Sequence, residues 1–185
     1  MRGIVSNRCY AEIMSIINDR EVSFDDRRRS VLAAINAASG KACLTTVDSS
    51  RLFAHFLSAA RFELGPAVAL QIFQEYVSVS EVHDGMDGPY YVALECCIAS
   101  GRFHTALNLA EECISISKYV SRSNWLVSVA ALLGSYAAAM IGQIDKASDL
   151  LDCINDGECV SWLEGVPIIS KVELLENIAR LRRTQ

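Results

Sequence analysis

Two short segments, GRFHTA at residues 101–106 and GQIDKA at residues 142–147, share the pattern Gly-x-[Phe/Ile]-x-x-Ala. Each segment follows one apolar stretch and precedes another, and the apolar residues of these stretches recur at helical spacing. The two glycines are 41 residues apart, as are the two alanines. Self-similarity at such a period predicts stacked pairs of helices.

The pattern has a physical reason. A tight turn between two antiparallel helices often needs one residue at positive φ, which glycine reaches without steric cost. The phenylalanine or isoleucine two positions later is expected to close the open end of the hairpin. The alanine five positions later is expected where two helices approach too closely for a larger side chain. The sequence therefore predicts helix, turn and helix around each segment.

These features resemble the tetratricopeptide repeat family, which has a Gly at the turn, an aromatic residue two later and an Ala five later. The resemblance is clearest over residues 89–156, and Gly65-Pro66 marks a degenerate earlier copy. It implies an all-α fold, a right-handed stack of antiparallel helical hairpins with about nine to ten helices. No Pro follows the second helix of either clear repeat. The family's large-residue, Leu-Gly and Tyr positions fall on Tyr90, Ala93, Leu94 and Cys97, then on Ala131, Gly134, Ser135 and Ala138.

Length and composition set further limits. The 185 residues suffice for one domain with a sizeable core, so residues 1–185 are expected to form a single helical-repeat domain. Hydrophobic residues make up 51% of the chain, which fits either Ala-rich helix packing or an apolar surface kept for a partner. A net charge of −5 disfavours direct binding to nucleic acid.

The seven cysteines have no paired Cys-x2-Cys spacing, so we expect core residues and no metal site. No secretory signal is visible at the N-terminus, and reduced thiols in the cytoplasm are expected. The longest uncharged run, residues 125–141, is short for a membrane span. The cysteines are Cys9, Cys43, Cys96, Cys97, Cys113, Cys153 and Cys159.

Helix starts can be placed in the first half of the chain. One helix carries the stripe Tyr10, Ile13, Met14 and Ile17, and a second is expected to begin at residues 23–26 with Asp25 accepting from free N–H groups. The run at residues 27–29 is three arginines, either an anion-binding patch or, as we favour, a solvated first turn. A further helix is expected to begin at residues 45–48 and to break at Gly65-Pro66, and a loop is expected over residues 82–89.

The C-terminal part is expected to contain no strand. Residues 155–157 are expected to end the eighth helix, and residues 158–164 to form a short helical turn. A capping helix is then expected over residues 168–183. Its predicted apolar stripe consists of Ile168, Val172, Leu175, Ile178 and Ala179.

The family resemblance also implies a binding surface. In tetratricopeptide-like stacks the first helices of the pairs line a concave groove, and contacts are counted back from the turn glycines. That surface could accept the apolar face of an amphipathic helix, or it could be filled by the chain's own N-terminal helices. The implied partner-binding residues are His55, Phe62, Tyr91, Glu95, Ile98, Leu132 and Tyr136.

The functional expectation is a non-enzymatic module, without cofactor or metal, that binds a protein or peptide in this groove. Similar bacterial modules serve as chaperones of secreted proteins or as sensory parts of transcription regulators. Two other classes stay open: a hydrolase that assembles a Cys or Ser nucleophile with His55, His83 or His104 in space, and a structural subunit that self-associates, for example as a homodimer. The sequence has no Gly-x-Ser-x-Gly motif, and Gly85-x-x-Gly88 lacks the Lys-Ser/Thr pair of a phosphate loop.

Overall fold

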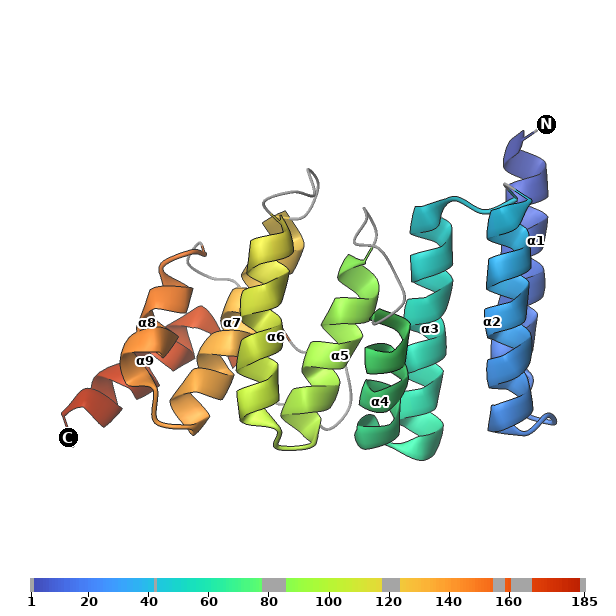
Figure 1. Ribbon diagram of the computed structural model, residues 1–185. Coiled ribbons are helices and arrows are strands. Elements are labelled where there is room, and N and C mark those ends of the chain that lie inside the picture. The colour runs from blue at the N-terminus through green and yellow to red at the C-terminus, as the bar shows by residue number, and fades with distance from the viewer. Residues whose placement is uncertain are drawn as a thin grey trace. The chain divides into compact units, whose positions relative to one another are not determined.

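The computed structural model describes residues 2–41, 43–77, 86–117, 124–154, 159–160 and 168–183 (Figure 1). Within these ranges the chain is all-α, with nine helices packed in sequential order and one pair of two-residue strands. The predicted class and helix count are confirmed for this part of the chain. Contacts separate two compact units, Met1–Val92 and Ala93–Gln185, and the interpretation of the chain as one domain stays a prediction.

The first unit contains four helices and the start of a fifth. The first helix packs against the second, the second against the third and the third against the fourth, and the first also packs against the third. Of the expected stripe in the first helix, Ile13 and Ile17 are buried, and Tyr10 and Met14 are half-buried. The third helix buries Phe53 and Phe56. The helices are α1 (Arg2–Asn18), α2 (Phe24–Gly40), α3 (Thr46–Leu64), α4 (Pro66–Val77) and α5 (Asp87–Ala99).

Local signals fix where these helices begin. Thr45 forms a capping box with Asp48 at the start of α3, as expected. Gly65, at φ 92°, ends α3, and Pro66 begins α4. The expected cap of α2 is corrected: Ser23, and not Asp25, accepts the hydrogen bond from the backbone N–H of Asp26. A Ser hydroxyl directly before the helix is better placed for this bond than a carboxylate inside the first turn.

Aromatic contacts hold the core of the first unit. Phe53 stacks on Tyr76 with ring centroids 3.7 Å apart, which joins α3 to α4. Phe24 stacks on Phe56 at 5.1 Å and joins α2 to α3. Tyr90 meets the edge of Phe73 at 5.1 Å, which fastens the start of α5 to α4. Buried aromatic pairs of this kind contribute area burial and a geometric preference together.

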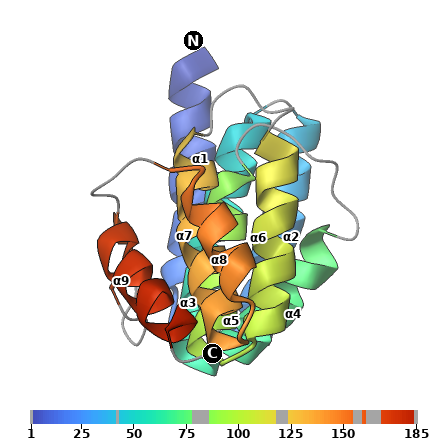
Figure 2. The same ribbon diagram turned by 90° about the vertical axis from the view of Figure 1, so that its left-hand side faces the viewer.

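The second unit contains the rest of α5 and the remaining elements. The helix α7 packs against α6, α8 and α9, and α8 also packs against α9 (Figure 2). The Ala-rich α7 is therefore covered on several sides, which explains its lack of a polar face. The remaining elements are α6 (Phe103–Ser117), α7 (Asn124–Met140), α8 (Ile144–Leu151), β1 (Cys159–Val160), β2 (Ile169–Ser170) and α9 (Lys171–Arg182).

The two glycine turns share one hydrogen-bond pattern. Gly101 has φ 68°, its N–H donates to the carbonyl of Ile98, and the N–H of Arg102 donates to the carbonyl of Cys97. Gly142 has φ 79°, and the N–H groups of residues 142 and 143 make the equivalent two bonds to residues 139 and 138. Both are Schellman motifs, in which the glycine at positive φ satisfies carbonyls that the helix end leaves open. The predicted turn chemistry is confirmed.

Small residues bring the helices of the second unit close together. Ala106 and Ala147, the alanines of the repeated pattern, are both fully buried. A Cβ on Gly134 of α7 would lie only 2.7 Å from the Cβ of Ala110 on α6. On the other side of α7, the Ser135 hydroxyl donates to the carbonyl of Ala147 on α8 at 2.7 Å. Small side chains are therefore a condition of this packing.

Several predicted boundaries are wrong. The helix α5 already begins at Asp87, inside the expected loop, and α8 ends at Leu151. Strands occur where none was expected: β1 pairs antiparallel with β2, so residues 159–160 are not a helical turn and the last helix begins at Lys171 instead of residue 168. A Ser170 side chain that accepts from the N–H of Glu173 caps that later start. Residues 78–85, 155–158 and 161–167 lie outside the described part of the chain.

Candidate functional site

A hollow of about 220 Å³ lies between α1 and α3 in the first unit. Two of the predicted binding residues, His55 and Phe62, line it. The Phe62 ring is 72% exposed, and the guanidinium of Arg20 lies 5.6 Å from its centroid. A cation over an exposed aromatic face is stabilising by about 0.5–1 kcal/mol, so the two side chains form one amphipathic edge. The other lining residues are Met14, Ile17, Asn18, Ser58, Ala59 and Glu63.

A buried cation organises the wall behind this hollow. Arg27 is only 3% exposed, donates to the carbonyl of Ile17 at 2.9 Å, and forms an ion pair with Glu63. Hydrogen bonds from Arg27 are the main cause that lowers the pKa of Glu63 below its ordinary value. The expectation of a solvated arginine run is therefore wrong at Arg27. Arg28 pairs with Glu75 of α4, and only Arg29, paired with Asp26, lies exposed within its own first turn.

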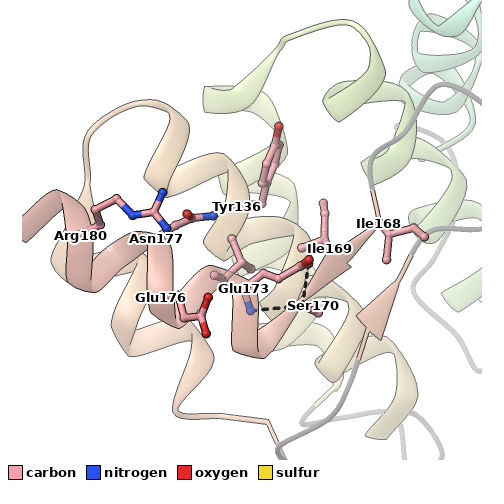
Figure 3. Close-up of a pocket in the computed structure, with 9 residues that line it drawn as sticks. Tyr136, Ile168, Ile169, Ser170, Glu173, Glu176, Asn177 and Arg180 are labelled. Atoms are coloured by element: carbon pink, nitrogen blue, oxygen red, sulfur yellow. Dashed lines mark hydrogen bonds between the residues drawn. The ribbon is translucent and has the colours of Figure 1, made fainter.

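A second hollow, of about 310 Å³, lies between α7 and α9 in the second unit, and the predicted residue Tyr136 lines it (Figure 3). The edge of Phe103 lies against Tyr136 at 6.0 Å between ring centroids. Phe103, which follows the Gly101 turn, therefore holds the ring of Tyr136 in place. Residues 168–180 supply the rest of the lining: Ile168, Ile169, Ser170, Glu173, Leu174, Glu176, Asn177 and Arg180.

The lining of this second hollow combines apolar and polar groups. Ile169 and Leu174 are buried and provide an apolar base. In Figure 3 the side chains of Asn177 and Arg180 lie next to each other on α9, on the side that faces Tyr136. An amide that both donates and accepts, a phenol and a guanidinium are groups that pair with peptide backbone or a carboxylate. The hollow can therefore hold a side chain and hydrogen-bond the chain that carries it.

The other predicted binding residues occupy different positions. Glu95, Ile98 and Leu132 are buried in the second unit. Tyr91 is half-buried on the part of α5 that belongs to the first unit. None of these four residues lines either hollow described above. Their role in binding stays a prediction.

Counting from the turn glycines predicted two of the nine residues that line the first hollow and one of the nine that line the second. It could not identify the α1 residues beside α3, or the α9 residues beside α7. The α9 residues carried a usable signal, because Ser170 followed by Glu173 is a helix-start pattern. Recognising it would have started the expected C-terminal helix at residue 171, with Asn177 and Arg180 about two and about three turns into it.

Among the described cysteines, Cys96, Cys97 and Cys113 are buried in the core, and Cys9 and Cys43 are half-buried neighbours that interact with each other. Burial raises the pKa of Cys97 to about 12, and burial also raises the pKa of Cys113. Such thiols stay protonated at neutral pH and are poor nucleophiles. Cys153 is exposed, and among the described residues no three His, Cys, Asp or Glu side chains are grouped as metal ligands. His55 and His104 are exposed in different units, and His83 lies outside the described residues.

No protein-family model, curated protein or solved structure matches this chain. The resemblance to tetratricopeptide repeats therefore rests on the residues quoted above. Of the described helices, none combines the length and the hydropathy that crossing a bilayer requires.

Proposed function

We propose that this protein is a non-enzymatic interaction module that binds a peptide or helix of a partner protein. Its architecture would be a tetratricopeptide-like, right-handed stack of antiparallel helix pairs. The support is the repeated unit itself: two Schellman turns 41 residues apart, each followed by a fully buried alanine five residues after the glycine. By the same resemblance, the module would act in the cytoplasm as a bacterial chaperone or as an adaptor in regulation.

The hollow beside Tyr136 carries the proposal. Binding sites for peptides combine an apolar pocket with a few polar groups that fix orientation. Here the apolar base is formed by Ile169 and Leu174, and the polar groups are Asn177 and Arg180. We expect one apolar side chain of the partner to enter this hollow, while the amide of Asn177 pairs with the partner's backbone.

The hollow beside Phe62 is the second contact region of the proposal. Phe62 and Arg20 present an aromatic ring and a cation on an exposed edge, and His55 lies on the same helix. Exposed aromatic and Arg side chains are the residue types that carry most binding energy in protein interfaces. We expect this edge to contact the partner independently of the Tyr136 hollow.

Photo-crosslinking from single positions tests the proposal. A p-benzoylphenylalanine would replace Tyr136 in one variant and Phe62 in another, which keeps an aromatic ring at each place. Matched controls would carry the same group at Asn108 on α6 and Gln74 on α4, both exposed and outside the two hollows. We expect a defined partner protein to crosslink from Tyr136 or Phe62 and from neither control.

The crosslinked partner segment would then be synthesised and its affinity measured. We expect Asn177→Ala to weaken binding of this peptide about tenfold, because one hydrogen-bonding group in a partly buried site contributes about 1–2 kcal/mol. Circular dichroism would show that the variant keeps its helices. Equal crosslinking from all four positions would contradict the proposed site. So would a peptide whose affinity is unchanged when Asn177 or Tyr136 is substituted.

A further inference from the structure

The outer face of α9 leaves an apolar row in water. Val172 is 51% exposed and Leu175 is 39% exposed, and Ala179 follows at helical spacing and is also exposed. Ile168, just before the helix, is 72% exposed. The predicted apolar stripe therefore does not face the core, because Ile178 is its only buried member. Ile178 and Leu174 together form the buried face of α9. The terminal helix of a repeat stack normally has a polar outer face, and this apolar row interrupts the polar face of α9.

The charges beside this row are ordered along the helix. Glu173, Glu176, Arg180 and Arg183 recur at spacings of three and four residues, so they form a second exposed row next to the first. The acidic pair comes first and the basic pair last. The other two cations of this segment are engaged within the unit. Lys171 donates to the carbonyl of Ile154, and Arg182 pairs with Asp145 at 3.0 Å.

We propose that α9 pairs with the α9 of a second copy of this chain in an antiparallel, two-fold symmetric contact. A two-fold axis perpendicular to the helices places the same row of both helices side by side and reverses the direction of one relative to the other. The acidic first half of one row then faces the basic second half of the other. In a two-fold parallel pair the two charged rows would lie on opposite sides of the contact and could not pair with each other, so the order of charges favours the antiparallel arrangement.

The proposed contact between the two α9 helices is small, so we expect it to be weak. A 12-residue helix is about 18 Å long, so an isolated α9 pair lies below the size of a permanent interface. We expect a reversible dimer that dissociates on dilution. Glu173, Glu176 and Arg180 of the charged row also line the peptide hollow, so Leu175→Glu, which changes no residue of that lining, separates this pairing from the peptide site proposed above.

Charge reversal tests the proposal with the full chain. Glu176→Arg makes the row mostly basic, and the double variant Arg180→Glu plus Arg183→Glu makes it wholly acidic. Each variant alone opposes like charges, so we expect its dimer dissociation constant to rise about tenfold or more in sedimentation velocity. An equimolar mixture opposes unlike charges, and we expect it to form a heterodimer about as stable as the wild-type dimer.

Two further variants separate this pairing from loss of structure. Leu175→Glu places a charge in the apolar row, and we expect it to abolish the dimer both alone and in the mixture. Asp149, an exposed residue of α8, supplies the control: Asp149→Arg makes the same charge change as Glu176→Arg, and we expect it to leave the dissociation constant of the dimer at the wild-type value. A wild-type chain that stays monomeric at all concentrations would overturn the proposal, whether or not another protein binds α9. Dimers that survive Leu175→Glu, or charge variants that fail to restore each other, would overturn it as well.

Discussion

Arg27 connects three segments of the first unit through a single guanidinium. Arg27 lies in the first turn of α2. It donates to the carbonyl of Ile17 at the end of α1 and to the carbonyl of Val22 in the following loop, and it forms an ion pair with Glu63 near the end of α3. The Cζ atom of its guanidinium lies 5.2 Å from the centroid of the Phe24 ring. Buried ion pairs add little over an apolar replacement, but removing one partner leaves the other groups unsatisfied. The α1–α2–α3 arrangement therefore depends on this side chain.

We predict that Arg27→Ala lowers the free energy of unfolding by roughly 2–4 kcal/mol, since it strands the Ile17 carbonyl and the Glu63 carboxylate. Chemical denaturation followed by circular dichroism would measure the loss. The matched control is Arg29→Ala, which removes an exposed pair with Asp26 and is expected to cost less than about 1 kcal/mol. Equal losses for the two variants would contradict the structural role of Arg27.

The same pair gives the wild type a dependence on pH. The folded-state pKa of Glu63 lies below its ordinary value, so the ionised carboxylate stabilises the folded state above the unfolded pKa. That contribution is lost as the pH falls through the lowered folded-state pKa. The difference in stability between wild type and Arg27→Ala should therefore be largest at neutral pH and shrink in acid below about pH 4.

At the scale of elements, the close approach of α6, α7 and α8 depends on Gly134. An added Cβ would lie 2.7 Å from the Cβ of Ala110 and 3.3 Å from a Leu150 methyl group. The alanine Cβ is fixed to the backbone, so the helices themselves would have to move apart. This steric demand opposes the usual preference of a helix for alanine over glycine.

We predict that Gly134→Ala destabilises the protein by about 1–3 kcal/mol, although alanine raises helix propensity by about 1 kcal/mol. Gly40→Ala is the matched control. Gly40 is the last residue of α2, and no heavy atom of the described structure is within 4 Å of the added Cβ. We expect the control to change stability by less than about 0.5 kcal/mol or to raise it slightly. Thermal unfolding of both variants would compare them, and a more stable Gly134→Ala would show that the helices have room.

The elements also show which parts of the fold a sequence can reveal. Turns set by a glycine at positive φ, such as Gly101 and Gly142, and caps such as Thr45 were predictable because their cause is local. The burial of Arg27 and the outward row at Val172 were not, because each depends on which helix packs beside it. The candidate site divides in the same way. Tyr136 could be counted from a turn, whereas Asn177 comes from a helix whose neighbour the sequence does not specify.

At the scale of the whole molecule, one helix belongs to both units. The boundary between the units falls after Val92, inside α5, which runs from Asp87 to Ala99. The first six residues of α5 supply Tyr90, which is fully buried and packs on Phe73 in the first unit. A helix of six residues is too short to persist in water by its own hydrogen bonds. The core of the first unit therefore needs the part of α5 that is assigned to the second.

We predict that a fragment of residues 1–92 is less stable than a fragment of residues 1–100, which keeps all of α5. Truncation at 92 removes the second half of the helix, so Tyr90 should lose its fixed place against Phe73 and the fragment should melt at a lower temperature. Thermal melts by circular dichroism would compare the two, and the fluorescence of the four tyrosines that each fragment contains, Tyr10, Tyr76, Tyr90 and Tyr91, would follow the same transition. Tyr90→Ala in residues 1–100 is the matched control, since it should remove most of the advantage of the longer fragment. Equal melting temperatures of the two unsubstituted fragments would mean that α5 is not shared, and that the first unit is complete at Val92.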